Sequence, residues 1–134
     1  MKQQVLVVED SEDIRVLLEY LLTNEGIPVV TAKNGKEGIE RLREMTNPGL
    51  VLLDLMMPVM TGEKFLDAKA LEPRIAKVPV VILSAATDRR QLVHSEGVVG
   101  FLRKPVNIDH VLSVVQDHCP SASSVESSAA ATIA

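Results

Sequence analysis

Five polar side chains in this sequence stand where short runs of apolar residues end. In chain order they are Glu9, Asp10, Asp54, Ser84 and Lys104. If three carboxylates lie close together, one must take up a proton unless a cation binds among them. Mg²⁺ suits such a site because it prefers a few carboxylates together with carbonyls, waters and phosphate oxygens. A carboxylate can also act as a nucleophile and become an aspartyl phosphate, while an ammonium and a hydroxyl group hold the transferred oxygens.

The apolar runs alternate with segments of helical periodicity, which predicts five units of a strand followed by a helix. The strands are expected at residues 5–8, 28–31, 50–53, 78–83 and 98–102. Strands that are apolar throughout are buried on both faces, which is typical of a parallel sheet covered by helices on each side. Right-handed crossovers then give a doubly wound, three-layer α/β/α sandwich. Ligands bind beyond the carboxyl ends of strands in such sheets, so the five polar groups are expected at one edge.

The helices carry their own start and stop signals. Ser11 is a candidate N-cap for the first helix and Gly26 its terminator. The apolar stripe of that helix is expected at Ile14, Leu17, Leu18, Leu21 and Leu22. Asn34 and Asn107 precede the second and the last helix, and the third and fourth are expected at about 63–71 and 88–95. Pro28 at the start of the second strand favours an edge position for that strand.

Composition excludes several classes of function. The 134 residues have a formal charge of −4, a pI near 5.3, and three aromatic side chains (one Tyr, two Phe). Such a chain is unsuited to binding a nucleic-acid backbone or stacking on bases. The first apolar run is too short for a signal peptide or a membrane span. Cys119 is the only cysteine, which excludes an intrachain disulfide and a cysteine zinc site and favours a reducing, cytoplasmic location; we expect it to be inert.

The composition changes near the end of the chain. Residues 1–119 contain all the strand and helix patterns and are expected to form one domain. Residues 120–134 are rich in Ser and Ala with only isolated branched apolar residues, so they bury too little surface to offset the entropy of ordering. We therefore expect 120–134 to be a disordered tail or a linker.

Four short motifs, each after its own predicted strand, carry a family resemblance. They are Val8-Glu9-Asp10, the segment from Asp54 to Gly62, Ser84-Ala85 and Lys104-Pro105. Together they resemble the receiver domain of bacterial two-component response regulators, over about residues 4–118. The resemblance implies a flavodoxin-like strand order of 2-1-3-4-5. It also implies a signalling switch that catalyses only its own phosphorylation and dephosphorylation.

The resemblance assigns a role to each polar residue of the predicted edge. Asp54 would accept a phosphoryl group from a histidine kinase or a phosphotransfer protein. Glu9, Asp10 and Asp54 would bind Mg²⁺, together with the backbone carbonyl of Met56. Lys104 would pair with the phosphoryl group.

A second set of residues would respond to phosphorylation or support the site. Ser84 would hydrogen-bond the phosphoryl group and move toward it, and Phe101 would turn inward on activation. The alternative for Phe101 is an ordinary core residue of the fifth strand. Pro58, Gly62 and Pro105 would be structural, and the Lys104–Pro105 bond is expected to be cis as in the family, although a simple strand-ending proline is the alternative.

Two departures from the family pattern bear on function. Lys104 follows Ser84 by 20 positions (104 minus 84), about two fewer than the family has, so the manner of docking to a downstream target protein stays open. Met56 and Ala86 occupy the two positions whose side chains tune phosphate lifetime in the family. Neither side chain can orient a hydrolytic water, which predicts slow self-dephosphorylation.

Three readings of the sequence compete. The leading one is a stand-alone receiver that controls a partner protein, either as a monomer or through a dimer formed on phosphorylation. A pseudo-receiver would keep the fold as a protein-interaction module without phosphotransfer. A Mg²⁺-dependent hydrolase would need a second acid two positions after the nucleophile, where the chain has Asp54-Leu55-Met56.

Overall fold

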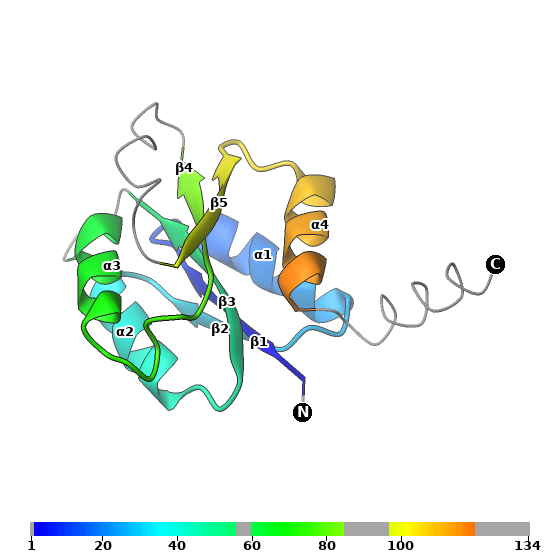
Figure 1. The fold of residues 1–134 in the computed structure, drawn as a ribbon. Helices are drawn as coiled ribbons and strands as arrows, with labels where there is room; N and C mark the ends of the chain where they lie inside the picture. Colours follow the sequence, from blue (N-terminus) through cyan, green and yellow to red (C-terminus); the bar gives the residue numbers. More distant parts are fainter. Residues whose placement is uncertain (1, 56–59, 85–96, 120–134) are drawn as a thin grey trace.

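The structure, a computed structural model, describes residues 2–55, 60–84 and 97–119. Strands and helices alternate along the chain up to β4 (Figure 1). The elements are β1 (Gln4–Val8), α1 (Glu12–Asn24), β2 (Val29–Ala32), α2 (Gly35–Glu44), β3 (Pro48–Asp54), α3 (Gly62–Ala70), β4 (Val80–Ser84), β5 (Val98–Arg103) and α4 (Ile108–His118). The expected helix at 88–95 and the tail at 120–134 lie outside the described residues.

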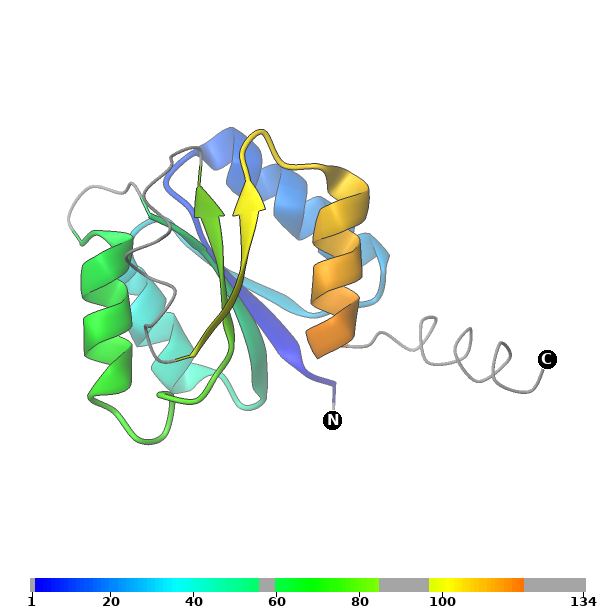
Figure 2. The same cartoon turned by 45° about the horizontal axis from the view of Figure 1, so that its top comes forward.

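The five strands form one parallel sheet in the order β2-β1-β3-β4-β5. Figures 1 and 2 show α2 and α3 on one face of this sheet and α1 and α4 on the other. The predicted three-layer architecture and strand order are therefore confirmed. β2 is an edge strand, as Pro28 indicated, and the Pro28 carbonyl accepts a hydrogen bond from the Val5 amide at 2.9 Å.

The core consists of two apolar layers, one on each face of the sheet. Alternate residues of a strand face opposite sides, so Leu6 and Val8 pack under α2 and α3 while Val5 and Val7 pack under α1 and α4. All four of these side chains are fully buried. Burial on both faces explains why the strand reads as a continuous apolar run.

The helix starts are capped as the sequence indicates. The side chains of Ser11, Asn34 and Asn107 each accept a hydrogen bond from a backbone amide of the first turn that follows. Gly26 lies just beyond the C-cap of α1 with φ of +78°, a conformation that glycine adopts without steric cost. No helix in the described ranges is long and apolar enough to cross a membrane.

Some boundaries and one buried position differ from the expectations. β3 begins at Pro48, before the apolar run, because β1 already pairs there and the Gln4 amide donates to the Asn47 carbonyl at 2.8 Å. Leu17 was expected on the buried stripe of α1, which is wrong: it is 40% exposed. Leu18 and Leu22 alone face the sheet fully, since a helix packed on a sheet buries a narrow stripe and Leu17 lies at its margin.

Candidate functional site

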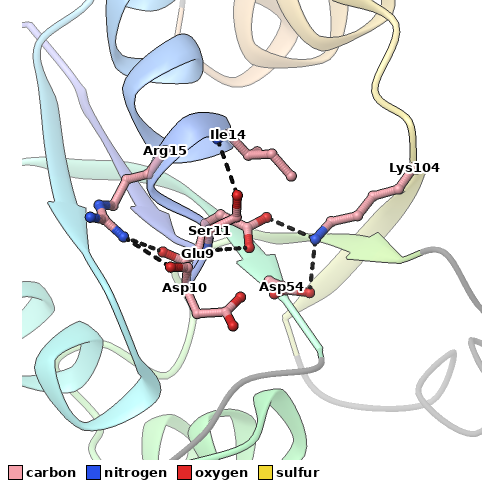
Figure 3. Close-up of polar contacts among 7 residues, drawn as sticks. All are labelled: Glu9, Asp10, Ser11, Ile14, Arg15, Asp54 and Lys104. Atoms are coloured by element: carbon pink, nitrogen blue, oxygen red, sulfur yellow. Dashed lines mark hydrogen bonds and ion pairs between the residues drawn. The ribbon is translucent and has the colours of Figure 1, made fainter.

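Three carboxylates and one ammonium meet at the carboxyl edge of the sheet (Figure 3). Glu9 and Asp10 leave the end of β1, and Asp54 closes the neighbouring strand β3. One carboxylate oxygen from each of these residues lies within 4.8 Å of the others. The sequence-based expectation that these side chains converge therefore agrees with the geometry.

Lys104 reaches the acidic residues from the far side of β4. Its ammonium lies 2.9 Å from Glu9 Oε1 and 3.3 Å from Asp54 Oδ1. Because β4 lies between β3 and β5, the lysine chain must extend across the end of β4 to make these contacts. Glu9 is fully buried and Asp54 is 3% exposed, whereas Asp10 is open to solvent. The site is thus a buried ion-pair network with one open, acidic side.

The three acids do not ionise alike. Burial raises the pKa of Asp54 to about 7, with hydrogen bonds to Glu9 and Asp10 and repulsion from Glu9 adding to the rise. Burial also opposes the ionised form of Asp10, but hydrogen bonds with Asp54 and Glu9 outweigh it and lower the pKa of Asp10. Burial alone would lower the pKa of Lys104, but its contacts with Glu9 and Asp54 raise that pKa. At neutral pH the metal-free cluster therefore holds a proton on Asp54 part of the time.

The chemistry of the donor set fits a divalent cation. Three carboxylates outnumber the single ammonium, so the ionised cluster keeps a net negative charge. Glu9 Oε1 is buried and accepts no hydrogen bond of good geometry from the described residues, although the Lys104 ammonium lies beside it. Converging carboxylates of this kind are typical ligands of Mg²⁺. Met56, whose carbonyl was expected to join them, lies outside the described residues.

The turn between β1 and α1 is held by its own hydrogen bonds. The Glu9 amide donates to the Ala32 carbonyl at 3.0 Å, and the Ser11 amide donates to Glu9 Oε2 at 3.2 Å. The guanidinium of Arg15 donates to the carbonyls of Glu9 and Asp10 (Figure 3). These contacts connect the backbone of both acids to the first turns of α1.

Gly62 supports the opposite side of the site. A Cβ at this position would lie 2.8 Å from the Leu55 Cα and 3.0 Å from the Asp54 carbonyl oxygen. The Gly62 amide donates to the Leu55 carbonyl at 3.1 Å, so α3 starts directly against the end of β3. Only the smallest residue fits this approach, and that explains why a glycine stands here. Pro58 lies outside the described residues.

The remaining site residues are placed less completely. The Lys104–Pro105 bond is cis, as the family resemblance implied. Ser84 is the last residue of β4, next to Arg103 of β5, and its side chain lies outside the description. Phe101 is partly buried and packs against the apolar layer under α2 and α3. Motion of Ser84 and Phe101 on activation stays a prediction.

Comparison with known families decides the classification. Residues 5–116 match the response regulator receiver domain, which covers most of the chain. The chain belongs to this family. This family belongs to two-component signalling. The fold, the acidic cluster and the lysine that follows β5 are therefore those of a receiver domain.

The curated relatives of this chain differ in length. The chain is 35% identical to the DNA-binding transcriptional regulator NtrC of Escherichia coli K12 over 114 residues, which cover 84% of this chain but only 24% of NtrC. It is 32% identical over 120 residues to an uncharacterised 14.6 kDa protein of Leptolyngbya boryana, covering 88% of this chain and 91% of that protein. The chain thus spans about a quarter of the regulator and most of the small protein.

Solved structures of the family resemble this receiver closely. A response regulator receiver protein from Pseudomonas putida superposes with a TM-score of 0.80 at 31% identity, covering 87% of this chain and 98% of that one. The chemotaxis response regulator CheY4 of Vibrio cholerae gives 0.79 at 28% identity, covering 88% and 99%. The chain therefore resembles these receiver domains over nearly their whole length.

Two buried or partly buried basic residues were not anticipated from the sequence. Arg15 lies within α1 and looks like a solvated helical residue by its spacing, because the carbonyls that it contacts leave no trace in a sequence pattern. Lys69 is 1% exposed and donates to the Ala76 carbonyl at 2.6 Å. Its spacing of four from the buried Phe65 was a signal that could have revealed it, since residues four apart share a helix face.

Proposed function

We propose that this receiver is a phosphorylation-activated switch in which Asp54 accepts a phosphoryl group from a histidine kinase or a phosphotransfer protein. The observation that supports this proposal most strongly is the position of Asp54. It lies at the end of β3, beside two other carboxylates and 3.3 Å from the Lys104 ammonium. A carboxylate nucleophile needs nearby positive charge to offset the charge of the transferred group. The Lys104 ammonium and an acidic cluster that could hold a cation support this role.

The transfer itself balances without a further reactant. An oxygen of the Asp54 carboxylate attacks phosphorus and forms a new O–P bond. The P–N bond of a phosphohistidine breaks, and its electron pair leaves with the imidazole; with a small acyl phosphate the P–O bond to the acyl group breaks instead. In this proposal Lys104 holds its ammonium beside the incoming phosphoryl oxygens, and its contact with Asp54 at 3.3 Å supports that role.

Mg²⁺ is the cofactor that this proposal requires. Glu9, Asp10 and Asp54 would hold it, together with the Met56 carbonyl that the family pattern suggests. A bound Mg²⁺ supplies charge neutralisation and orientation of the phosphoryl oxygens. The chain's own residues provide the rest. Asp54 is a buried nucleophile, Lys104 provides an ammonium, and the side of the site at Asp10 is exposed, so that a phosphoryl donor could approach there.

The output of the switch is a change in binding to a partner protein. Phosphorylation adds charge at the edge formed by β1, β3 and β4, and we propose that Ser84 and Phe101 carry the response toward β5. The proposal includes no direct nucleic-acid contact by this domain, in keeping with its acidic composition. It also puts the receiver in the cytoplasm, where Cys119 remains a free thiol.

The phosphorylated form should be long-lived. Met56 and Ala86 are apolar, and neither side chain is able to hydrogen-bond a water molecule for attack on the phosphoryl group. We propose slow self-dephosphorylation on this basis. A half-life of seconds or less in Mg²⁺ buffer would contradict it.

Intact-protein mass spectrometry after incubation with a small acyl phosphate tests the function. We expect one added phosphoryl group on the parent in the presence of Mg²⁺, little in the presence of EDTA, and none on Asp54→Asn. Asp67→Asn, the same change at an exposed position of α3, is the matched control and should be labelled like the parent. No label on the parent with an acyl phosphate or with a phosphorylated histidine donor would overturn the proposal and leave a protein-interaction module.

A further inference from the structure

Arg15 contacts both acidic residues of the β1–α1 turn without touching their carboxylates. Its Nη1 atom donates to the Glu9 carbonyl oxygen at 2.9 Å and to the Asp10 carbonyl oxygen at 3.4 Å (Figure 3). Within residues 2–55, 60–84 and 97–119, Arg15 forms no ion pair. The guanidinium is therefore used to bind backbone, at two consecutive peptide groups.

These two peptide groups set the direction in which the Asp10 side chain leaves the backbone. The carbonyls of Glu9 and Asp10 belong to the peptide planes on either side of the Asp10 Cα. Fixing both planes fixes the backbone at Asp10 and with it the direction of the Cα–Cβ bond. The Glu9 amide and the Glu9 carboxylate each make a further hydrogen bond, to the Ala32 carbonyl and from the Ser11 amide, and the side chain is fully buried. Asp10 is exposed, and beyond the contacts of its carboxylate with Asp54 and Glu9 its side chain lacks the packing that holds Glu9. Asp10 is thus the acid that depends most on Arg15.

We propose that Arg15 is a positioning residue for the metal site, which holds the Asp10 carboxylate toward Glu9 and Asp54 by clamping the turn behind it. The inference rests on the proposed binding of a divalent cation by these acids. Outer groups that orient metal ligands strengthen metal affinity by about 10- to 100-fold in other proteins. We expect about a tenfold effect here, because one of the two hydrogen bonds is long.

The charge of Arg15 would act in the opposite direction. A guanidinium next to the acidic cluster repels an incoming divalent cation, so removal of this charge alone would tighten metal binding. The two effects therefore predict changes of opposite sign for the same substitution. The geometric effect dominates in our proposal, because both hydrogen bonds direct the guanidinium to the backbone side of the turn and the carboxylates lie on its other side.

Mg²⁺ titration of two variants separates the effects. Arg15→Met removes both the hydrogen bonds and the charge, whereas Arg15→Lys keeps the charge but replaces the Nη1 atom that makes both hydrogen bonds by an ammonium on a shorter side chain. The affinity is measured by calorimetry or from the backbone amide shifts of Asp10 and Ser11 on the full chain. We expect the Mg²⁺ dissociation constant to rise about tenfold in Arg15→Met and by several-fold in Arg15→Lys. Arg41→Met, an exposed arginine of α2, is the control and should match the parent.

A second readout distinguishes positioning from a general loss of structure. Phosphoryl incorporation from an acyl phosphate should recover in Arg15→Met when Mg²⁺ is raised to saturation, and thermal unfolding in EDTA should stay close to that of Arg41→Met. If Arg15→Met does not fold, Arg15→Lys decides alone, since it keeps the charge and any loss of affinity then reports on the two hydrogen bonds that Nη1 makes in the parent.

The outcomes separate this inference from the proposed function. Equal or tighter Mg²⁺ binding in both variants, with normal binding by the parent, would overturn the role of Arg15 and leave the function intact. A parent that binds no Mg²⁺ would overturn the function on which the inference rests.

Discussion

The raised pKa of Asp54 makes the stability of the metal-free protein depend on pH in a defined direction. The carboxyl group titrates near 3.8 when unperturbed and at about 7 in the fold. The folded protein thus binds this proton more tightly than the unfolded chain. The contribution to stability is complete below the unperturbed value and is lost as the pH rises through about 7. The Asp54→Asn substitution removes this loss, so the variant should be more stable than the parent at pH 8.

The magnitude follows from the size of the shift. A change from 3.8 to about 7 corresponds to roughly three pKa units, or about 4 kcal/mol as an upper limit. The lowered pKa of Asp10 acts in the opposite direction, because its stabilising effect is present above the unperturbed value and lost in acid. The protons belong to the coupled cluster as a whole, which reduces the net effect. We therefore expect Asp54→Asn to gain about 1–3 kcal/mol at pH 8 and much less at pH 5.

Thermal unfolding in EDTA at pH 5 and pH 8 measures this difference. A gain of 1 kcal/mol raises the melting temperature by about 4 °C for a domain of this size. Asp67→Asn, at an exposed site of α3, controls for the loss of one negative charge and should show the same small change at both pH values. The reasoning fails if Asp54→Asn is less stable than the parent at pH 8, or if its gain is the same at pH 5.

Three further predictions concern Lys104, Gly62 and Cys119. Lys104→Met leaves the buried Glu9 and Asp54 carboxylates without the ammonium that pairs with them. The free energy of unfolding, measured by denaturant titration, should therefore fall by about 1–3 kcal/mol at pH 8 and by less at pH 5. An equal loss at both pH values would contradict this prediction. Gly62→Ala inserts a Cβ against the backbone of Leu55 and should cost about 1–3 kcal/mol, measured by thermal unfolding; a neutral effect would mean that α3 shifts freely. Burial raises the pKa of the Cys119 thiol to about 11. Alkylation of this thiol at pH 8 should therefore be slow in the native protein and rapid in denaturant. Complete labelling within minutes under native conditions would show that the Cys119 thiol is accessible.

The layers and strand order followed from the sequence because burial on both faces leaves a strong pattern. Val5 to Val8 are all apolar, and strands of that kind are compatible with few architectures. The strand order itself came from the family resemblance, since apolar periodicity does not specify which strands are neighbours. Boundaries such as Pro48 depended on hydrogen bonds to β1 that no local pattern records.

The composition of the site was predictable and its internal contacts were not. Parallel strand ends bring Glu9, Asp54 and Lys104 to one edge, so residue type and position were sufficient. The contact of Lys104 with Glu9 as well as Asp54 depends on how far a flexible lysine side chain extends across β4. Arg15 was missed for a related reason, because a side chain that binds backbone carbonyls has no partner residue type to suggest it.

The central claim is that Asp54 is the residue that forms the phosphoryl bond, and chemical mapping tests it most directly. Borohydride reduces an aspartyl phosphate to homoserine with release of phosphate, and so marks the acceptor permanently. After phosphorylation with an acyl phosphate and Mg²⁺, we expect peptide mass spectrometry to place homoserine at position 54 and at no other acidic residue. Homoserine or a related reduced product at Glu9 or Asp10, with Asp54 unchanged, would contradict the account.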